Sequence, residues 1–174
     1  MSSGGVTLRI YPVDFSNCRM DGNLNNKGVI CSLRNFSLLL DFDGVLATKF
    51  STQSSPFDPD CTENLKSIIK WLKTRFDEVK VVVISNWRFD RTDSQIIDLL
   101  YDHGDLQAHE ITILDRSFRK KEGIVEYIKL HELKSGEFVI LDDDFLGEDL
   151  AVHQIRTRSE DGIRDLDTLE GFIP

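Results

Sequence analysis

Two carboxylates stand two residues apart at the end of an apolar run, in the sequence LLLDFDG at residues 38–44. Alternate side chains of an extended chain share one side, so Asp41 and Asp43 can point to the same spot, and Gly44 lets the backbone turn after them. Two acids beside a buried strand end are costly unless something positive lies between them. A bound metal ion or a phosphoryl group between the two carboxylates would offset this cost. The alternative without a function is a solvent-exposed Asp-x-Asp-Gly turn.

Polar residues also follow other apolar runs. A second run is followed by Ser85 and Asn86, and a later one ends at Asp142 and Asp143, while a lysine pair at 120–121 opens an amphipathic segment between them. A carboxylate nucleophile, oxygen ligands for a divalent cation, a hydroxyl and an ammonium are the groups that phosphoryl transfer requires. Carboxylates gathered this closely would repel one another without a cation, so the set favours a metal-dependent reaction.

An α/β architecture would bring these groups together. Apolar, strand-like runs alternate with amphipathic, helix-like runs from residue 37 onward. The expected strands are 37–42, 79–84, 110–114, 137–142 and about 151–155, and the expected helices are 61–75, 92–103 and 119–132. This order predicts a three-layer α/β/α, Rossmann-like domain with a mostly parallel central sheet. The carboxyl ends of such strands share one edge, where ligands bind.

The composition and net charge are those of an acidic globular protein. The chain has 174 residues, of which 40% are hydrophobic and 29% charged, as expected for one globular domain at 37–174. Residues 1–36 are richer in turn-forming types and predict a separate β-rich appendage or tail. The net charge of −9 argues against stable nucleic-acid or anionic-membrane binding. Three scattered cysteines predict neither a zinc site nor disulfides, and without a signal peptide or a membrane span we expect a cytoplasmic location.

Over about residues 37–157 the chain resembles the haloacid dehalogenase-like (HAD) superfamily. Four motifs stand in the family's order: LLLDFDGV at 38–45, VVISN at 82–86, RKKEGI at 119–124 and VILDD at 139–143. The second and fourth are similar to those in HAD domains of nucleic-acid end-repair phosphatases. The resemblance implies a Mg²⁺-dependent phosphatase that hydrolyses a phosphate monoester. The short spacings between the motifs leave no room for the family's cap domain.

The resemblance also implies roles at the first motif. Asp41 would be the nucleophile, forming an aspartyl phosphate, and a metal ligand. Asp43 would be the general acid and then the general base, with its backbone carbonyl on magnesium. An aspartate at this second position favours phosphate esters over haloacids.

The other three motifs would supply phosphate and metal contacts. By resemblance, Ser85 and the amides near Asn86 would bind the phosphoryl oxygens. By the same resemblance, Lys120 or Lys121 would bind the phosphoryl oxygens. The family often places this lysine four residues before the first buried residue of the helix, which here is Ile124, and this spacing favours Lys120. Asp142 and Asp143 would complete the metal site.

An uncapped site would admit bulky substrates, such as a nucleic-acid end, a phosphoprotein or a phosphorylated metabolite. We expect Arg88, Arg91, Arg116 and Arg119 to supply local positive charge near its mouth, and Trp87 to pack nearby or flank the substrate. Two alternatives remain: a HAD-fold binding or regulatory protein without turnover, and a phosphotransferase that uses the same site. A signalling receiver is disfavoured, because its acids and lysine follow a different order along the chain.

Overall fold

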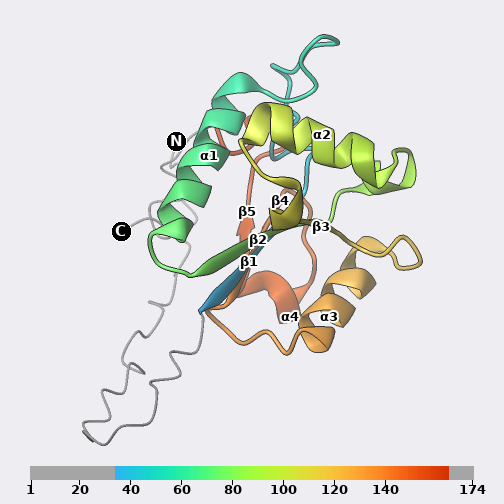
Figure 1. The fold of residues 1–174 in the computed structure, drawn as a ribbon. Helices are drawn as coiled ribbons and strands as arrows, with labels where there is room; N and C mark the ends of the chain where they lie inside the picture. Colours follow the sequence, from blue (N-terminus) through green and yellow to red (C-terminus); the bar gives the residue numbers. More distant parts are fainter. Residues whose placement is uncertain (1–33, 165–174) are drawn as a thin grey trace, which may run out of the picture. The chain divides into compact units, whose positions relative to one another are not determined.

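A five-stranded sheet forms the centre of the domain in this computed structural model, which describes residues 34–164 (Figure 1). All paired strands are parallel, and their order is β3-β2-β1-β4-β5. The predicted Rossmann-like architecture is therefore confirmed, with β1 in the middle. The predicted appendage at 1–36, except its last three residues, and the predicted closing helix near 165–172 lie outside the described residues. The strands are β1 (Asn35–Leu40), β2 (Glu78–Val83), β3 (Ile111–Ile113), β4 (Phe138–Asp142) and β5 (Gln154–Arg156).

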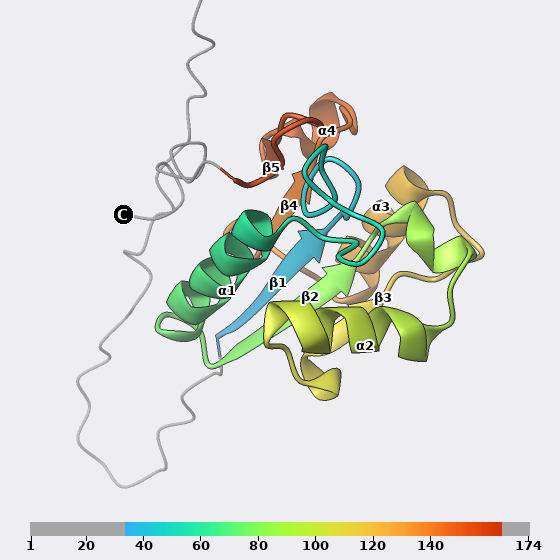
Figure 2. The ribbon, with the colours of Figure 1, turned by 90° about the horizontal axis from the view of Figure 1, so that it is seen from above.

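Helices cover both faces of this sheet. Figures 1 and 2 show α1 and α2 over one face, and α3 and α4 over the other. Their bounds are Pro59–Lys73, Asp93–Gly104, Lys120–Leu130 and Glu148–Ala151. The expected helices α1, α2 and α3 are present within two residues of their predicted bounds. The chain therefore forms the three expected layers.

Alternating side chains of β1 divide the core into two apolar clusters. Leu38 and Leu40 pack with the buried residues of α1 and α2, whereas Leu39 packs with Ile124 of α3 and Leu150 of α4. All three β1 leucines are fully buried. Burying one leucine side chain contributes roughly 2 kcal/mol, so the central strand is firmly held from both faces. Because Asp41 directly follows this strand, its backbone is also held in place.

The loop after β1 is tied to the start of α1 by a buried carboxylate. Asp58 caps α1 by accepting from the backbone N–H of Asp60 at 3.0 Å, and it also accepts from Thr48 Oγ1 at 2.9 Å. The backbone N–H of Asp58 donates to the carbonyl of Leu46 at 2.8 Å. Substituting such a cap costs about 1 kcal/mol, and here it would also loosen the loop that follows β1.

The predicted start of the last strand was wrong. The last strand begins at Gln154 rather than at about 151, because one turn of helix, α4, precedes it. Gly147, with a φ of 109°, starts that turn in a conformation that side chains other than glycine disfavour. A helix of four residues is too short to show the hydrophobic periodicity by which helices are recognised in a sequence.

The described part of the chain contains no cap domain. Only α1 lies between β1 and β2, and only α2 with the short 3₁₀ helices η2 (Asn86–Phe89) and η3 (Ala108–Glu110) lies between β2 and β3. Within residues 34–164 no helix is long and apolar enough to cross a membrane.

Candidate active site

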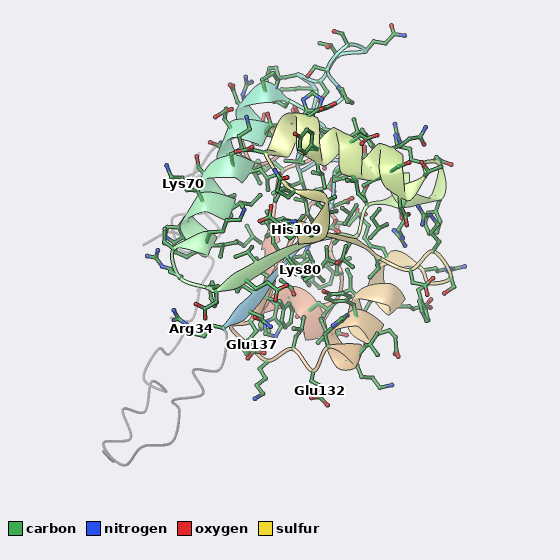
Figure 3. All side chains as sticks on the ribbon, viewed as in Figure 1. Arg34, Lys70, Lys80, His109, Glu132 and Glu137 are labelled. Atoms are coloured by element: carbon green, nitrogen blue, oxygen red, sulfur yellow. The ribbon has the colours of Figure 1, made fainter. Side chains whose placement is uncertain are left out.

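The polar residues predicted from the sequence converge at the carboxyl edge of the sheet. Asp41 directly follows β1, Asp142 is the last residue of β4, and Lys120 is the first residue of α3. Figure 2 shows the arrowheads of β1, β2 and β4 pointing toward this same edge. Figure 3 looks onto the opposite edge, where Arg34 and Glu137 precede β1 and β4.

Lys120 joins the acids of two neighbouring strands. Its Nζ lies 2.5 Å from Asp41 Oδ2, 3.1 Å from Asp142 Oδ2 and 3.7 Å from the exposed Asp144. Asp41 and Asp142 are buried, and the Lys120 side chain is only 12% exposed. Burial alone would lower the pKa of Lys120, but the charges and hydrogen bonds of the two buried carboxylates outweigh it and raise that pKa. The ammonium is therefore held in its charged form.

The neighbouring lysine takes a different direction. Lys121 Nζ lies 2.8 Å from Asp149 Oδ1 on the surface, and both side chains are exposed. Of the two candidates, the structure thus places Lys120 against Asp41. The first helix turn explains the choice, because adjacent helical residues point about 100° apart and Lys120 is the one on the side of the sheet.

Three carboxylates at this edge form a cluster that could hold a metal ion. Asp41, Asp142 and Asp143 each offer an oxygen, and these oxygens all lie within 4.8 Å of one another. Carboxylate oxygens are the ligands that Mg²⁺ prefers. When all are ionised, three carboxylates and the Lys120 ammonium leave two negative charges, which a divalent cation would balance.

Asp142 carries an oxygen that lacks a hydrogen bond. Its Oδ1 accepts from the backbone N–H of Asp144 at 2.9 Å, whereas its buried Oδ2 has only the ion-pair contact with Lys120. Burial and the nearby charge of Asp41 raise the pKa of Asp142 to about 6 from the usual 3.8, against the opposing effect of Lys120. An orphaned carboxylate oxygen within the cluster fits a metal ligand, since a cation would satisfy it.

Gly44 makes room for the third carboxylate. Its backbone has a φ of 67°, and a Cβ at this position would lie 2.3 Å from Asp143 Cγ. Only glycine permits both the turn after β1 and this close approach. Ser159 Oγ donates to Asp143 Oδ2 from the other side, so the carboxylate is fixed between the first and last segments of the described domain.

Asp43 stands beside the cluster and is exposed to solvent. Its Oδ2 accepts a hydrogen bond from Trp87 Nε1 at 2.9 Å. Partial burial, together with the charge of Asp41, raises the pKa of Asp43 despite the opposing effect of the indole. Its carboxylate is not among the three clustered ones.

Ser85 and Asn86 follow β2 at the same edge. Ser85 is buried and caps η2, its Oγ accepting from the backbone N–H of Trp87 at 3.3 Å. Because the oxygen accepts, the hydroxyl hydrogen stays available as a donor. Asn86 is exposed and begins η2.

The expectation that Arg88, Arg91, Arg116 and Arg119 supply positive charge near the mouth of the site was wrong for Arg88. Its guanidinium is fully buried and donates to the carbonyls of Ile84, Ser85 and Phe118 at 2.7 to 3.0 Å. Arg116 donates to the carbonyl of Arg88 and pairs with Asp93 on α2. Both side chains therefore hold the loops after β2 and β3 together.

Two side chains from β5 and the segment that follows it also bind the backbone at this edge, and the sequence did not predict them. Gln154 is buried; its Nε2 donates to the carbonyls of Asp142 and Asp144 at 3.2 and 2.6 Å, and its Oε1 accepts from the N–H of Leu146 at 3.4 Å. Thr157 Oγ1 donates to the Gly44 carbonyl at 2.6 Å. Both act on distant backbone, so no local pattern marks them.

Comparison with protein-family models matches residues 37–168 to the family described as the HAD domain in Swiss Army Knife RNA repair proteins. The chain belongs to this family. The match covers the sheet except for Asn35 and Phe36 at the start of β1, and it includes every candidate site residue. This confirms the HAD assignment and its nucleic-acid repair type. It supports a phosphatase-type enzyme with a metal site. No curated protein and no solved structure matches the chain.

Proposed function

We propose that this HAD domain is a Mg²⁺-dependent phosphatase that works through an aspartyl phosphate on Asp41. The observation that supports it best is the buried contact of the Lys120 ammonium with Asp41 and Asp142 beside the cluster of three carboxylates. Burying these charges costs several kcal/mol per ion, and a purely structural site would gain more from apolar residues. Clusters of this kind are typical of catalytic sites.

In the first step a carboxylate oxygen of Asp41 attacks phosphorus, and the bond from phosphorus to the leaving oxygen breaks. Asp43 gives its proton to that oxygen as the general acid. The Lys120 ammonium and the Ser85 hydroxyl donate to the phosphoryl oxygens that carry the developing charge. Asp41 is fixed for attack because its Oδ1 accepts from the N–H of Phe42 at 2.8 Å.

In the second step water attacks the aspartyl phosphate, and Asp43 takes the proton as the general base. The carboxylate of Asp41 is then released and inorganic phosphate leaves. Mg²⁺, held by Asp41, Asp142, Asp143 and the Asp43 carbonyl, would neutralise charge so that an anionic nucleophile can approach an anionic phosphate.

We further propose a phosphorylated nucleic-acid end as the substrate. The family description names RNA repair, and the absence of a cap between the described strands leaves the site accessible to a long chain. The net charge of −9 argues that the protein engages the end alone and does not track a phosphate backbone. A phosphoprotein or a phosphorylated metabolite remains the alternative, and the cytoplasmic location stays a prediction.

The experiment measures phosphate release from an aryl phosphate and from oligonucleotides with a 3′ or a 5′ phosphate, with Mg²⁺ or with EDTA. Asp41→Asn should abolish release from every substrate, because an amide is a poor nucleophile. Asp102→Asn, an exposed substitution on α2, is the matched control and should behave as the unaltered protein. Metal-independent release, or release that survives Asp41→Asn, would refute the proposal.

Two further outcomes separate the alternatives. Added alcohol that receives the phosphoryl group in preference to water would identify a phosphotransferase, since only water access to the aspartyl phosphate differs. An absence of turnover on every substrate, with Mg²⁺ still raising the melting temperature, would favour the binding or regulatory protein.

A further inference from the structure

Trp87 contacts two groups of the proposed reaction at once. Its indole Nε1 donates to Asp43 Oδ2 at 2.9 Å, and its backbone N–H donates to Ser85 Oγ at 3.3 Å. The first contact involves the proposed proton carrier and the second the proposed phosphoryl-binding hydroxyl. One residue, placed just after β2, thus joins groups from the loops of two different strands.

The indole ring is held on several sides. It stacks on Phe57 with centroids 5.6 Å apart and an interplanar angle of 19°, and it meets Phe42 edge-on at 5.4 Å. Both phenylalanines are fully buried. The guanidinium of Arg91 lies 4.1 Å from the indole centroid. The direction of the Nε1–H bond is therefore set by the core beneath the ring and by a cation against it.

The chemistry of the indole decides which carboxylate oxygen remains for proton transfer. Indole N–H is a donor only, so its partner Asp43 Oδ2 must be an acceptor without a proton. Oδ1 is then the oxygen that carries the proton when Asp43 acts as an acid. A hydrogen bond to an exposed carboxylate contributes little to stability, so its effect is on the orientation of the group.

We propose that Trp87 is a positioning residue that orients Asp43 so that its Oδ1 faces the leaving oxygen. The inference rests on the proposed function. Packing alone would be served by phenylalanine, which stacks on Phe57 and Phe42 as well. The N–H directed at Asp43 is what phenylalanine lacks.

The test compares Trp87→Phe with the unaltered protein on two substrates, an alkyl phosphate and a nitrophenyl phosphate. The alkoxide is a poor leaving group and needs the general acid, whereas nitrophenolate leaves without help. We expect kcat/KM to fall about tenfold for the alkyl ester and about twofold or less for the nitrophenyl ester. Because both values come from one preparation, their ratio is independent of how much of the variant is folded. An equal fall for both esters would overturn the proposal.

Two controls separate positioning from packing. Trp71→Phe, at the far end of α1, should leave the ratio of the two substrates unchanged. In a chain that already carries Asp43→Ala, Trp87→Phe should have no further effect on kcat, since its action runs through Asp43. A full additional loss in that double variant would assign Trp87 to packing or to substrate contact and overturn the proposal.

A spectroscopic measurement checks the contact without turnover. The chain has only two tryptophans, so its ¹H–¹⁵N spectrum shows two indole signals, which Trp71→Phe assigns. Asp43→Asn should shift the Trp87 signal upfield and leave the other in place. If the Trp87 signal shifts in Asp43→Asn but the unaltered protein hydrolyses no ester, the proposed function is refuted, while the hydrogen bond between Trp87 and Asp43 is confirmed. Hydrolysis by the unaltered protein, with neither a shift nor a change of ratio, would refute the role of Trp87 alone.

Discussion

Asp142→Asn should stabilise the metal-free protein at neutral pH. Asn keeps the Oδ1 that accepts from the Asp144 N–H, and it removes a buried negative charge whose Oδ2 has no hydrogen bond and only the ion-pair contact with Lys120. The pKa of Asp142 is raised to about 6 in the folded chain from 3.8. The ionised form is thus disfavoured by folding, and about two pKa units correspond to about 3 kcal/mol.

The sign of the pH dependence follows from this upward shift. Between pH 4 and 6 the folded state binds more protons than the unfolded state, so the Asp142 side chain makes stability fall as pH rises through that window. Below pH 4 both states are protonated and the penalty vanishes. The advantage of Asp142→Asn should therefore be about 1.5 kcal/mol at pH 5 and about 3 kcal/mol at pH 8.

Urea unfolding in EDTA at pH 5 and pH 8, followed by circular dichroism, measures this difference. Mg²⁺ at about 1,000 times its Kd should reverse the order even at pH 8, because only the unaltered protein keeps the full ligand set and such a concentration adds about 4.1 kcal/mol. Asp144→Asn, exposed and in the same turn, is the matched control. If Asp142→Asn is less stable than the unaltered chain at pH 8 in EDTA, the inference that the buried Asp142 carboxylate destabilises the metal-free fold is refuted.

Two more predictions concern the neighbours of this carboxylate. Lys120→Met should reduce kcat at least about 100-fold, because the phosphoryl charge loses its buried cation, whereas Lys121→Met should change it less than about twofold; steady-state kinetics on an aryl phosphate compares the two. Comparable losses would contradict the assignment of the lysine. Gln154→Leu should destabilise the domain by about 2 kcal/mol, since three backbone groups in residues 142–146 each lose a hydrogen bond to Gln154. It should also raise the Mg²⁺ concentration needed for half-maximal activity. An unchanged Mg²⁺ requirement would show that the turn holds its shape without Gln154.

The strands and the residues at their ends could be predicted because both leave local signals. Near-continuous apolar runs mark buried parallel strands, and the acids follow them directly, as at Asp41 and Asp142. The contacts that orient these acids could not be predicted. Gln154 and Thr157 bind backbone atoms that are distant in sequence, and the indole of Trp87 reaches a carboxylate on another strand's loop. Charge alone was also misleading at Arg88, whose burial depends on the loop that carries Phe118.

The central place of β1 also bears on the order in which the domain can assemble. Of the strands in the described sheet, β1 is made first during synthesis, and β2 can pair with it early. Its other neighbour, β4, is made only after α2, β3 and α3, and the contacts of Gln154 and Thr157 come later still. An incomplete nascent chain therefore exposes one edge of β1 and lacks two of the three clustered acids. The proposed metal site and the proposed phosphoryl-transfer site would thus form together in one late step, when the last strands complete the sheet.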